Sequence, residues 1–237
     1  MTLFSVALVG ADGAGKTTVG RRLHETLPLP TRSIYMGVNL EASRLVLPTT
    51  WLLLSIRRAR GTRPDLVAST DPRTASAAPS GPLRRATAGA KSALRLCNWL
   101  AEEAFRHSVA SYHRRRGRIV VLDRSFYHDY YAYDVAPNGA RSPARRIHGF
   151  FLERVYPKPD LVICLDAPAE VLYARKPEAP VEWLERRRAE YLDLARVAPN
   201  FVVVDAARPL AEVEADVEAA VLGFHRRAAA VNQAVPT

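Results

Sequence analysis

The chain has 237 residues, of which 48% are hydrophobic, and this suits a single globular domain with a real core over residues 1–237. Its two cysteines, Cys97 and Cys164, lie far apart and lack metal-ligand spacing, which argues against a disulfide framework and a zinc site and fits a reducing cytoplasm. The formal net charge of +10 comes mostly from arginine, which suits phosphate or nucleic acid but also an ordinary solvated surface.

Apolar strand patterns and helical patterns alternate along the chain. Strands are predicted at residues 3–9, 32–36, 118–122, 160–165 and 200–204. Residues 119–122 and 161–165 are continuous apolar runs, which is typical of strands buried on both faces of a parallel sheet. Helices are predicted at residues 17–27, 94–115, 143–156, 168–174, 181–198 and 210–227. The alternation predicts a three-layer α/β fold, a doubly wound parallel sheet of about five strands with helices on both faces.

A glycine-rich loop follows the first predicted strand and precedes the first predicted helix. Residues 10–17 read Gly-Ala-Asp-Gly-Ala-Gly-Lys-Thr and match the phosphate-binding pattern G-x-x-x-x-G-K-[ST]. The glycines allow several backbone N–H groups to point at one phosphate chain, and the helix start adds a positive dipole end. Lys16 can reach the β- and γ-phosphates, and Thr17 can offer a hydroxyl to Mg²⁺. The motif therefore predicts a nucleoside triphosphate site made by Gly10, Gly13, Ala14, Gly15, Lys16, Thr17 and Thr18.

A second apolar segment follows Pro48, where residues 48–60 are predicted to be helical. We interpret the run from Trp51 to the basic Arg57 and Arg58 as a packed core helix with a basic end. The alternative is a helix that lies against a membrane or a partner subunit. The first residues of the chain form a strand pattern rather than a signal peptide, and the longest apolar patch is too short to span a bilayer. We therefore expect a cytoplasmic protein and no membrane partner.

The segment at residues 61–89 breaks the alternation. It has several prolines and no apolar period, which predicts a long mobile insertion within the domain rather than a domain boundary. Basic residues are concentrated between Arg57 and Arg95, but a solvated segment explains them and no recognition-helix or zinc-finger pattern accompanies them. Nucleic acid is therefore not an expected partner. The last residues, 228–237, are expected to form a frayed tail.

Three predicted strands end at an aspartate, namely Asp123, Asp166 and Asp205. The carboxyl ends of parallel strands form the ligand-binding edge of an open α/β sheet. At that edge, Asp123 can hold the hydration shell of Mg²⁺ or cap a neighbouring turn. Arg124 offers a fork of donors to a phosphate, or forms an ion pair with Asp12 or Asp123.

A short lid is predicted at residues 175–182. Arg175 and Lys176 directly precede two closely spaced prolines, which break the helix at this point. The next helix carries three consecutive arginines at residues 186–188. Consecutive helical residues point in different directions, so at most one or two of these arginines can face the site.

Three of these segments together resemble the thymidylate kinase family of P-loop nucleoside monophosphate kinases. They are the loop at residues 10–18, the Asp123-Arg124 pair and the stretch at residues 159–175. The resemblance covers about residues 3–220 apart from the segment 61–89. It implies a P-loop kinase fold and ATP- and Mg²⁺-dependent phosphoryl transfer to a small acceptor such as dTMP. Enzymes of this family are often dimers, so the resemblance also allows a homodimer.

The resemblance implies a role for each matching side chain. Asp12 would face the sugar of the acceptor, Arg124 would contact the phosphate of the acceptor, and Arg175 would cover the transferred phosphoryl group, with Lys176 as the second candidate. Thr17 and Asp123 would serve the Mg²⁺ ion. The implied catalytic residues are Lys16, Asp12, Asp123, Arg124 and Arg175.

Two acceptor positions depart from the family pattern. The arginine that family members carry on the helix before the third strand falls here at Glu102, with Arg106 or Arg95 as substitutes after a shift in register. The glutamine that follows the Asp-Arg helix falls at Asp134 after a one-residue insertion. An acid that faces a phosphate repels it. Together with Glu103, these acids suit a hydroxyl-rich acceptor, or they are surface residues of amphipathic helices.

Two alternatives to a monophosphate acceptor therefore stay open. Asp123-Arg124-Ser125 and the aromatic residues after it also resemble deoxynucleoside kinases, which implies a hydroxyl acceptor such as a nucleoside or a sugar. The other alternative is a nucleotide switch whose basic insertion binds nucleic acid or an anionic surface. His128 and His148 are expected to lie outside the site, because a lone histidine is usually polar surface or a satisfied hydrogen-bonding group.

Overall fold

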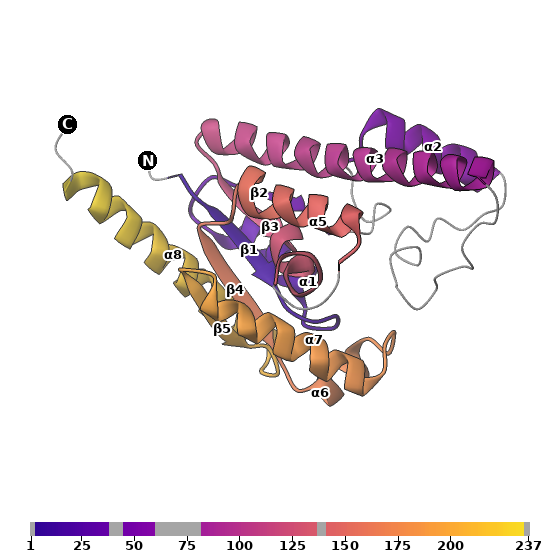
Figure 1. The fold of residues 1–237 in the computed structure, drawn as a ribbon. Helices are drawn as coiled ribbons and strands as arrows, with labels where there is room; N and C mark the ends of the chain where they lie inside the picture. The colour runs from indigo at the N-terminus through magenta and orange to yellow at the C-terminus, as the bar shows by residue number, and fades with distance from the viewer. Residues whose placement is uncertain (1–2, 38–44, 60–81, 137–140, 235–237) are drawn as a thin grey trace.

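The structure, a computed structural model, describes residues 3–37, 45–59, 82–136 and 141–234. One parallel sheet of five strands runs through the molecule in the order β2-β3-β1-β4-β5 (Figure 1). The strands are β1 (Ser5–Val9), β2 (Thr31–Tyr35), β3 (Ile119–Asp123), β4 (Leu161–Asp166) and β5 (Phe201–Asp205). Every predicted strand is present with small shifts at its ends, and the predicted α/β fold is confirmed.

The burial of the central strand β1 explains why the strand sequences are continuous apolar runs. It pairs with β3 in the register Ser5↔Val120 and with β4 in the register Val6↔Leu161. The side chains of Val6, Ala7, Leu8 and Val9 are all fully buried. A strand covered on both faces has no solvent side, so it shows no alternation of polar and apolar residues.

The helices cover both faces of this sheet (Figure 1). They are α1 (Lys16–Thr26), α2 (Pro48–Ala59), α3 (Pro82–Arg115), α4 (Phe126–Tyr130), α5 (Pro143–Phe150), α6 (Ala169–Arg175), α7 (Val181–Asp193) and α8 (Leu210–Ala234), with the short turns η2 (Tyr131–Val135), η3 (Phe151–Val155) and η4 (Leu194–Arg196). On one face, α1, α6 and α8 pack against the sheet in a cluster that includes Val19, Leu172 and Val217. On the other face, α4, η3 and the end of α7 contribute Phe126, Leu152 and Tyr191. The result is the expected three-layer arrangement.

Two helices extend beyond their predicted ends. Helix α3 begins at Pro82 rather than at residue 94, so the last part of the expected insertion at 61–89 is helical. Proline at a helix start and alanine-rich residues after it favour this earlier beginning. Residues 61–81 of the insertion lie outside the described residues. Helix α8 continues to Ala234, through most of the expected tail at 228–237, because this stretch is also rich in alanine.

Helix α2 forms where it was predicted, but the interpretation as a packed core helix is wrong at three large residues. The exposed fractions of Trp51, Leu52 and Ile56 are 64%, 54% and 41%. Polar contacts hold the start of α2 against α3, where the Asn98 side-chain amide donates to the Thr50 hydroxyl at 3.1 Å. These three apolar side chains of α2 therefore face outward. Within the described ranges, no helix has the length and apolar character needed to cross a membrane.

Candidate functional site

The loop between β1 and α1 requires glycine at specific positions. Gly10, Gly13 and Gly15 have φ values of 140°, 89° and 88°, a region that side chains disfavour. A Cβ atom on Gly10 would lie 2.3 Å from the carbonyl oxygen of Leu165, and one on Gly13 would lie 2.5 Å from that of Leu172. A Cβ atom on Gly15 would meet nothing within 4 Å. The loop is therefore pressed against the end of β4 and against α6, and its curl depends on the missing side chains.

Gly13 and Gly15 have nearly the same φ but different surroundings. Replacement by alanine should therefore reduce stability by different amounts at the two positions. We expect Gly15→Ala to lower the free energy of unfolding by about 1 kcal/mol, the usual cost of a left-handed backbone. Gly13→Ala should lower the free energy of unfolding by roughly 1–3 kcal/mol more than Gly15→Ala, because the new Cβ must displace the backbone of Leu172. Urea unfolding of both variants measures the difference. Equal losses would contradict the close packing of the loop against α6.

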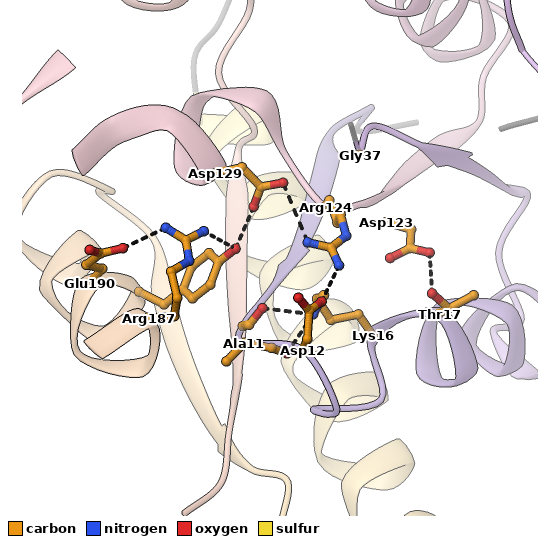
Figure 2. Close-up of polar contacts among 12 residues, drawn as sticks. Ala11, Asp12, Lys16, Thr17, Gly37, Asp123, Arg124, Asp129, Arg187 and Glu190 are labelled. Carbon is orange, nitrogen blue, oxygen red and sulfur yellow. Dashed lines mark hydrogen bonds and ion pairs between the residues drawn. The ribbon is translucent and has the colours of Figure 1, made fainter. Parts of the chain in front are cut away.

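Lys16 lies at the start of α1 and is almost fully buried. Its Nζ atom donates hydrogen bonds of 2.8 Å to the carbonyl oxygens of Gly10 and Ala11 (Figure 2). Burial, aided by the positive charge of Arg124, lowers the pKa of Lys16 to about 8, although nearby aspartates oppose the shift. The ammonium group is thus held within the loop by backbone carbonyl groups and remains mostly protonated at neutral pH.

Thr17 and Asp123 meet beside the loop. The Thr17 hydroxyl donates to Oδ2 of Asp123 at 2.8 Å (Figure 2), and the other carboxylate oxygen, Oδ1, is buried without a hydrogen-bond partner among the described residues. Burial raises the pKa of Asp123, with Thr17 and Lys16 acting in the opposite direction. No group of three histidine, cysteine or acidic side chains in the described part of the chain forms a metal cage. A cation here would have to share its ligands with a phosphate, which is how Mg²⁺ binds.

Arg124 follows β3 in an unusual backbone conformation. Its φ of 73° is the only positive value at a non-glycine residue among those described. Its backbone N–H donates to the carbonyl oxygen of Leu8 at 3.1 Å, and Nη2 of its side chain donates to Oδ1 of Asp12 at 2.5 Å. Burial acts to raise the pKa of Asp12, but the charges of Arg124 and Lys16 outweigh it and lower that pKa. The ion pair between Asp12 and Arg124, left open by the sequence, is present (Figure 2).

Glu102 is not a free acid in the acceptor region. Its Oε1 accepts hydrogen bonds from Nε and Nη2 of Arg106 at 3.3 and 3.2 Å, and its Oε2 accepts one from the N–H of Leu47 at 3.0 Å. Arg106 is 1% exposed and also donates from Nη1 to the carbonyl oxygen of Gly37 at 2.8 Å. A Cβ on Gly37 would lie 2.6 Å from Cδ of Arg124. Arg106 therefore reaches a backbone segment that touches Arg124.

Glu103 and Asp134 share one buried histidine. Nδ1 of His148 lies 2.6 Å from Oδ2 of Asp134, and Nε2 lies 3.1 Å from both carboxylate oxygens of Glu103. The His148 ring, fully buried, packs against Trp99 with a centroid distance of 3.9 Å. Burial acts to lower the pKa of His148, but the two carboxylates outweigh it and raise the pKa to about 9. The two acids are thus buried rather than surface residues, and His148 is a buried histidine whose two ring nitrogens are both hydrogen-bonded, the second of the two possibilities left open by the sequence.

The expected lid residues point in different directions. Arg175, at the end of α6, donates from Nη1 to the carbonyl oxygen of Ala206 at 2.7 Å. Lys176 pairs with Glu178 at 2.9 Å, and its charge also contributes to the lowered pKa of Asp12. Of these two cations, Lys176 is therefore the one whose charge reaches the loop.

Two of the three consecutive arginines of α7 face inward. Nε and Nη2 of Arg188 bind the two carboxylate oxygens of Asp166, at the end of β4, at 2.7 and 2.9 Å. Arg187 donates to Glu190 at 2.6 Å and to the hydroxyl of Tyr191 at 2.9 Å. These contacts agree with the expectation that no more than two arginines of the run face the strand ends.

Comparisons with known proteins find two proteins to which part of the chain is similar. It is 33% identical over 115 residues to a probable thymidylate kinase of Archaeoglobus fulgidus, a match that covers 46% of this chain and 55% of that protein. It is 35% identical over 101 residues to probable thymidylate kinase 1 of Saccharolobus solfataricus, covering 40% of this chain and 50% of that protein. The chain is thymidylate kinase-like. It spans about half the length of these curated relatives. No family model matches it.

Two residues of the candidate site, Tyr191 and Asp129, could not be recognised from the sequence. The Tyr191 hydroxyl donates to Oδ1 of Asp129 at 2.7 Å, a contact between residues 62 positions apart. Asp129 in turn lies 3.9 Å from Nη1 of Arg124. Neither residue belongs to a recognisable motif, and only the packing of α7 against α4 brings them together. Arg106 was found only as an alternative partner after a shift in register.

Proposed function

We propose that the chain is an ATP- and Mg²⁺-dependent kinase that transfers the γ-phosphoryl group to a nucleoside monophosphate of the thymidylate type. The observation that carries the proposal is the meeting of Lys16, Asp12 and Arg124 at the carboxyl ends of β1 and β3. Lys16 lies inside the proposed phosphate-binding loop. Arg124 contacts the carboxylate of Asp12 from outside that loop. Phosphoryl transfer needs this arrangement, since it depends on positioning and charge neutralisation rather than on covalent help from the protein.

The donor side of the site has the groups that ATP and Mg²⁺ require. The loop residues Gly10 to Thr18 would hold the phosphates with their backbone N–H groups. Thr17 and Asp123 would hold the metal, because the buried Oδ1 of Asp123 has no other partner among the described residues. Bound there, Mg²⁺ supplies positive charge between the phosphates. Lys16 would add its own charge without moving far, since its ammonium already lies in the loop.

The acceptor side favours a phosphate over a neutral hydroxyl. Of the acids that argued against a monophosphate, Glu102 is paired with the buried Arg106, and Glu103 and Asp134 share the buried His148. Their negative charge is therefore partly offset, and all three side chains are buried. Arg124, whose side chain is partly exposed, offers a guanidinium that suits a phosphate, while the buried Arg106 supports the segment at Gly37 beside it. No general base is needed when the acceptor is already a phosphate.

The proposed roles of Asp12 and of the lid residues depend on which charges lie near the loop. Asp12 would accept a hydrogen bond from the acceptor sugar. Lys176 is a better candidate than Arg175 for contact with the transferred group, because its charge acts on Asp12 while Arg175 is bound to the carbonyl of Ala206. A homodimer remains a prediction from the family resemblance. The switch alternative depends on the basic insertion at residues 61–89, of which residues 61–81 lie outside the described residues.

Removal of the Arg124 charge tests the acceptor. We expect Arg124→Ala to lower kcat/KM for dTMP by about 100-fold, mainly through a higher KM, because a charged hydrogen-bond donor to the acceptor phosphate is lost. The KM for ATP should change by no more than about twofold, since the donor site is intact. Steady-state ADP release with varied dTMP and varied ATP measures both values.

The matched control for Arg124→Ala is Arg196→Ala, which removes a guanidinium that is 82% exposed. This variant should behave like the parent chain. A loss from Asp12→Asn that exceeds the loss from Arg124→Ala would instead support a hydroxyl acceptor. Unchanged dTMP kinetics in Arg124→Ala would contradict the monophosphate assignment.

A further inference from the structure

A line of polar contacts runs from α7 to the phosphate-binding loop. It begins at Glu190 and Arg187, which form an ion pair of 2.6 Å on α7. Arg187 also donates to the Tyr191 hydroxyl at 2.9 Å, and this hydroxyl donates to Oδ1 of Asp129 at 2.7 Å. The line continues through Arg124 to Asp12, and Figure 2 shows the labelled residues converging from two sides of the sheet edge.

The direction of each hydrogen bond in this line is determined by the chemistry of the groups. A guanidinium can only donate, so the Tyr191 oxygen must accept from Arg187. The single hydroxyl proton of Tyr191 is then free to point at Asp129, whose carboxylate can only accept while it is ionised. Tyr191 is 3% exposed and Asp129 is 7% exposed, so water does not compete strongly for either group. The Tyr191 hydroxyl therefore fixes the orientation of the Asp129 carboxylate.

Asp129 acts on Arg124 through charge rather than through a hydrogen bond. Its Oδ2 atom is buried, has no hydrogen-bond partner among the described residues, and lies 3.9 Å from Nη1 of Arg124. Burial acts to lower the pKa of Arg124, whereas Asp129 and then Asp12 raise it, and the net pKa is above its usual value. The guanidinium is thus held between two carboxylates, one on the loop and one on α4.

Arg124 needs such support because its backbone is in a disfavoured conformation. A non-glycine residue with a φ of 73° is strained by about 1–2 kcal/mol and persists only where its surroundings impose it. The bond from its N–H to Leu8 holds the backbone, and the two carboxylates hold the side chain. Helix α7 begins at Val181, so it includes the last two residues of the expected lid at 175–182, and it carries Tyr191 at its buried face.

We propose that Asp129 and Tyr191 are positioning residues that orient the Arg124 guanidinium toward Asp12, and that α7 thereby links the lid segment to the acceptor side of the site. The inference rests on the proposed function, because it takes Arg124 as the contact to the acceptor phosphate. Neither positioning residue touches the acceptor in this arrangement. Their effect passes through Arg124 alone.

Removal of one hydroxyl tests this inference by kinetics. Tyr191→Phe in the full chain keeps the buried ring and removes both hydrogen bonds of the hydroxyl, the one donated to Asp129 and the one accepted from Arg187. We expect KM for dTMP to rise about tenfold, the value of one hydrogen bond, with KM for ATP unchanged. The matched control is Tyr112→Phe, which removes a hydroxyl from a ring that is 52% exposed on α3. Equal dTMP kinetics in the two variants would overturn the inference.

A second variant shows whether the two residues act as a unit. Asp129→Asn should raise KM for dTMP to a similar extent, and the double variant should be no worse than the poorer single variant because both changes break the same line of contacts. Independent, multiplying effects would overturn the inference. If Tyr191→Phe fails to fold, as judged by its thermal midpoint, Asp129→Asn carries the test.

An NMR measurement that does not require kinase activity distinguishes failure of this inference from failure of the proposed function. The Nε–H signal of Arg124 in an ¹H–¹⁵N NMR spectrum, identified by its loss in Arg124→Lys, should be resolved in the parent chain and in Tyr112→Phe. It should shift toward the position of free arginine in Tyr191→Phe. A chain without kinase activity that still shows this shift would refute the proposed function and support the positioning of Arg124. An active kinase whose signal does not move would refute the positioning and leave the function intact.

Discussion

Replacement of Lys16 with alanine should lower kcat with ATP and dTMP by about a thousandfold, on the order of 4 kcal/mol of transition-state stabilisation. Lys16 is the cation that the structure holds inside the glycine-rich loop, with its ammonium 2.8 Å from two loop carbonyl oxygens. Among the described residues, Arg124 also bonds to the loop, but it does so through the side chain of Asp12 and from outside. ADP release at saturating substrate measures the effect.

The control for Lys16→Ala is Lys158→Ala, which removes an exposed ammonium that lies over the ring of Tyr127. Its kcat should match that of the parent chain. A second readout is the rise in thermal midpoint on addition of ATP and Mg²⁺, which reports binding without turnover. This rise should be large in the parent chain and small in Lys16→Ala. Turnover within tenfold of the parent chain in Lys16→Ala would contradict the role of the loop.

Loss of the buried histidine should have the largest effect on stability. We expect His148→Phe to lower the free energy of unfolding by about 3–5 kcal/mol, because the carboxylates of Glu103 and Asp134 would remain buried without their shared partner. The thermal midpoint should fall by roughly 10 °C for a chain of this size. The phenyl ring keeps the contact with Trp99, so the loss reports charge rather than packing. Thermal and urea unfolding measure it.

The control for this prediction is a triple variant in which Glu103→Gln and Asp134→Asn accompany His148→Phe. It removes the two buried carboxylate charges together with His148. Its free energy of unfolding should therefore return most of the way to that of the parent chain. Equal stability of the single and triple variants would show that the charges of the cluster are not the cause.

The same cluster predicts how stability depends on pH. The pKa of His148 is raised to about 9 in the folded chain, against an ordinary value of 6.5. A raised pKa contributes stability that is complete below the unfolded value and is lost as pH rises through the folded value. We therefore expect the parent chain to lose up to about 3 kcal/mol relative to the triple variant between pH 6.5 and pH 9. Lys16 titrates in both chains and does not affect their difference.

Much of the fold could be predicted from the sequence because its signals are local. Continuous apolar runs marked β3 and β4, and the glycine pattern marked the loop before α1. The neighbouring positions of Lys16, Thr17 and Asp123 followed from the same logic, since parallel strands deliver their carboxyl ends to one edge.

The contacts that were missed depend on register between distant helices. Glu103 and His148 lie 45 positions apart, and a helical period does not show which helix faces which. Arg175 likewise bonds to Ala206, which lies 31 positions away in the chain. Such pairings are set by side-chain shape across the core, and a single sequence carries no separate signal for them.

The place of β1 in the sheet has a consequence for biosynthesis. β1 precedes the other described strands in the chain, yet it pairs on both sides with strands that begin at Ile119 and Leu161. At a translation rate of about 5–20 residues per second, both of its edges stay open on the order of ten seconds while the ribosome completes its partners. An apolar strand with open edges is prone to pair with other nascent chains. We therefore expect the glycine-rich loop that follows β1 to reach its final position only after β4 has left the exit tunnel.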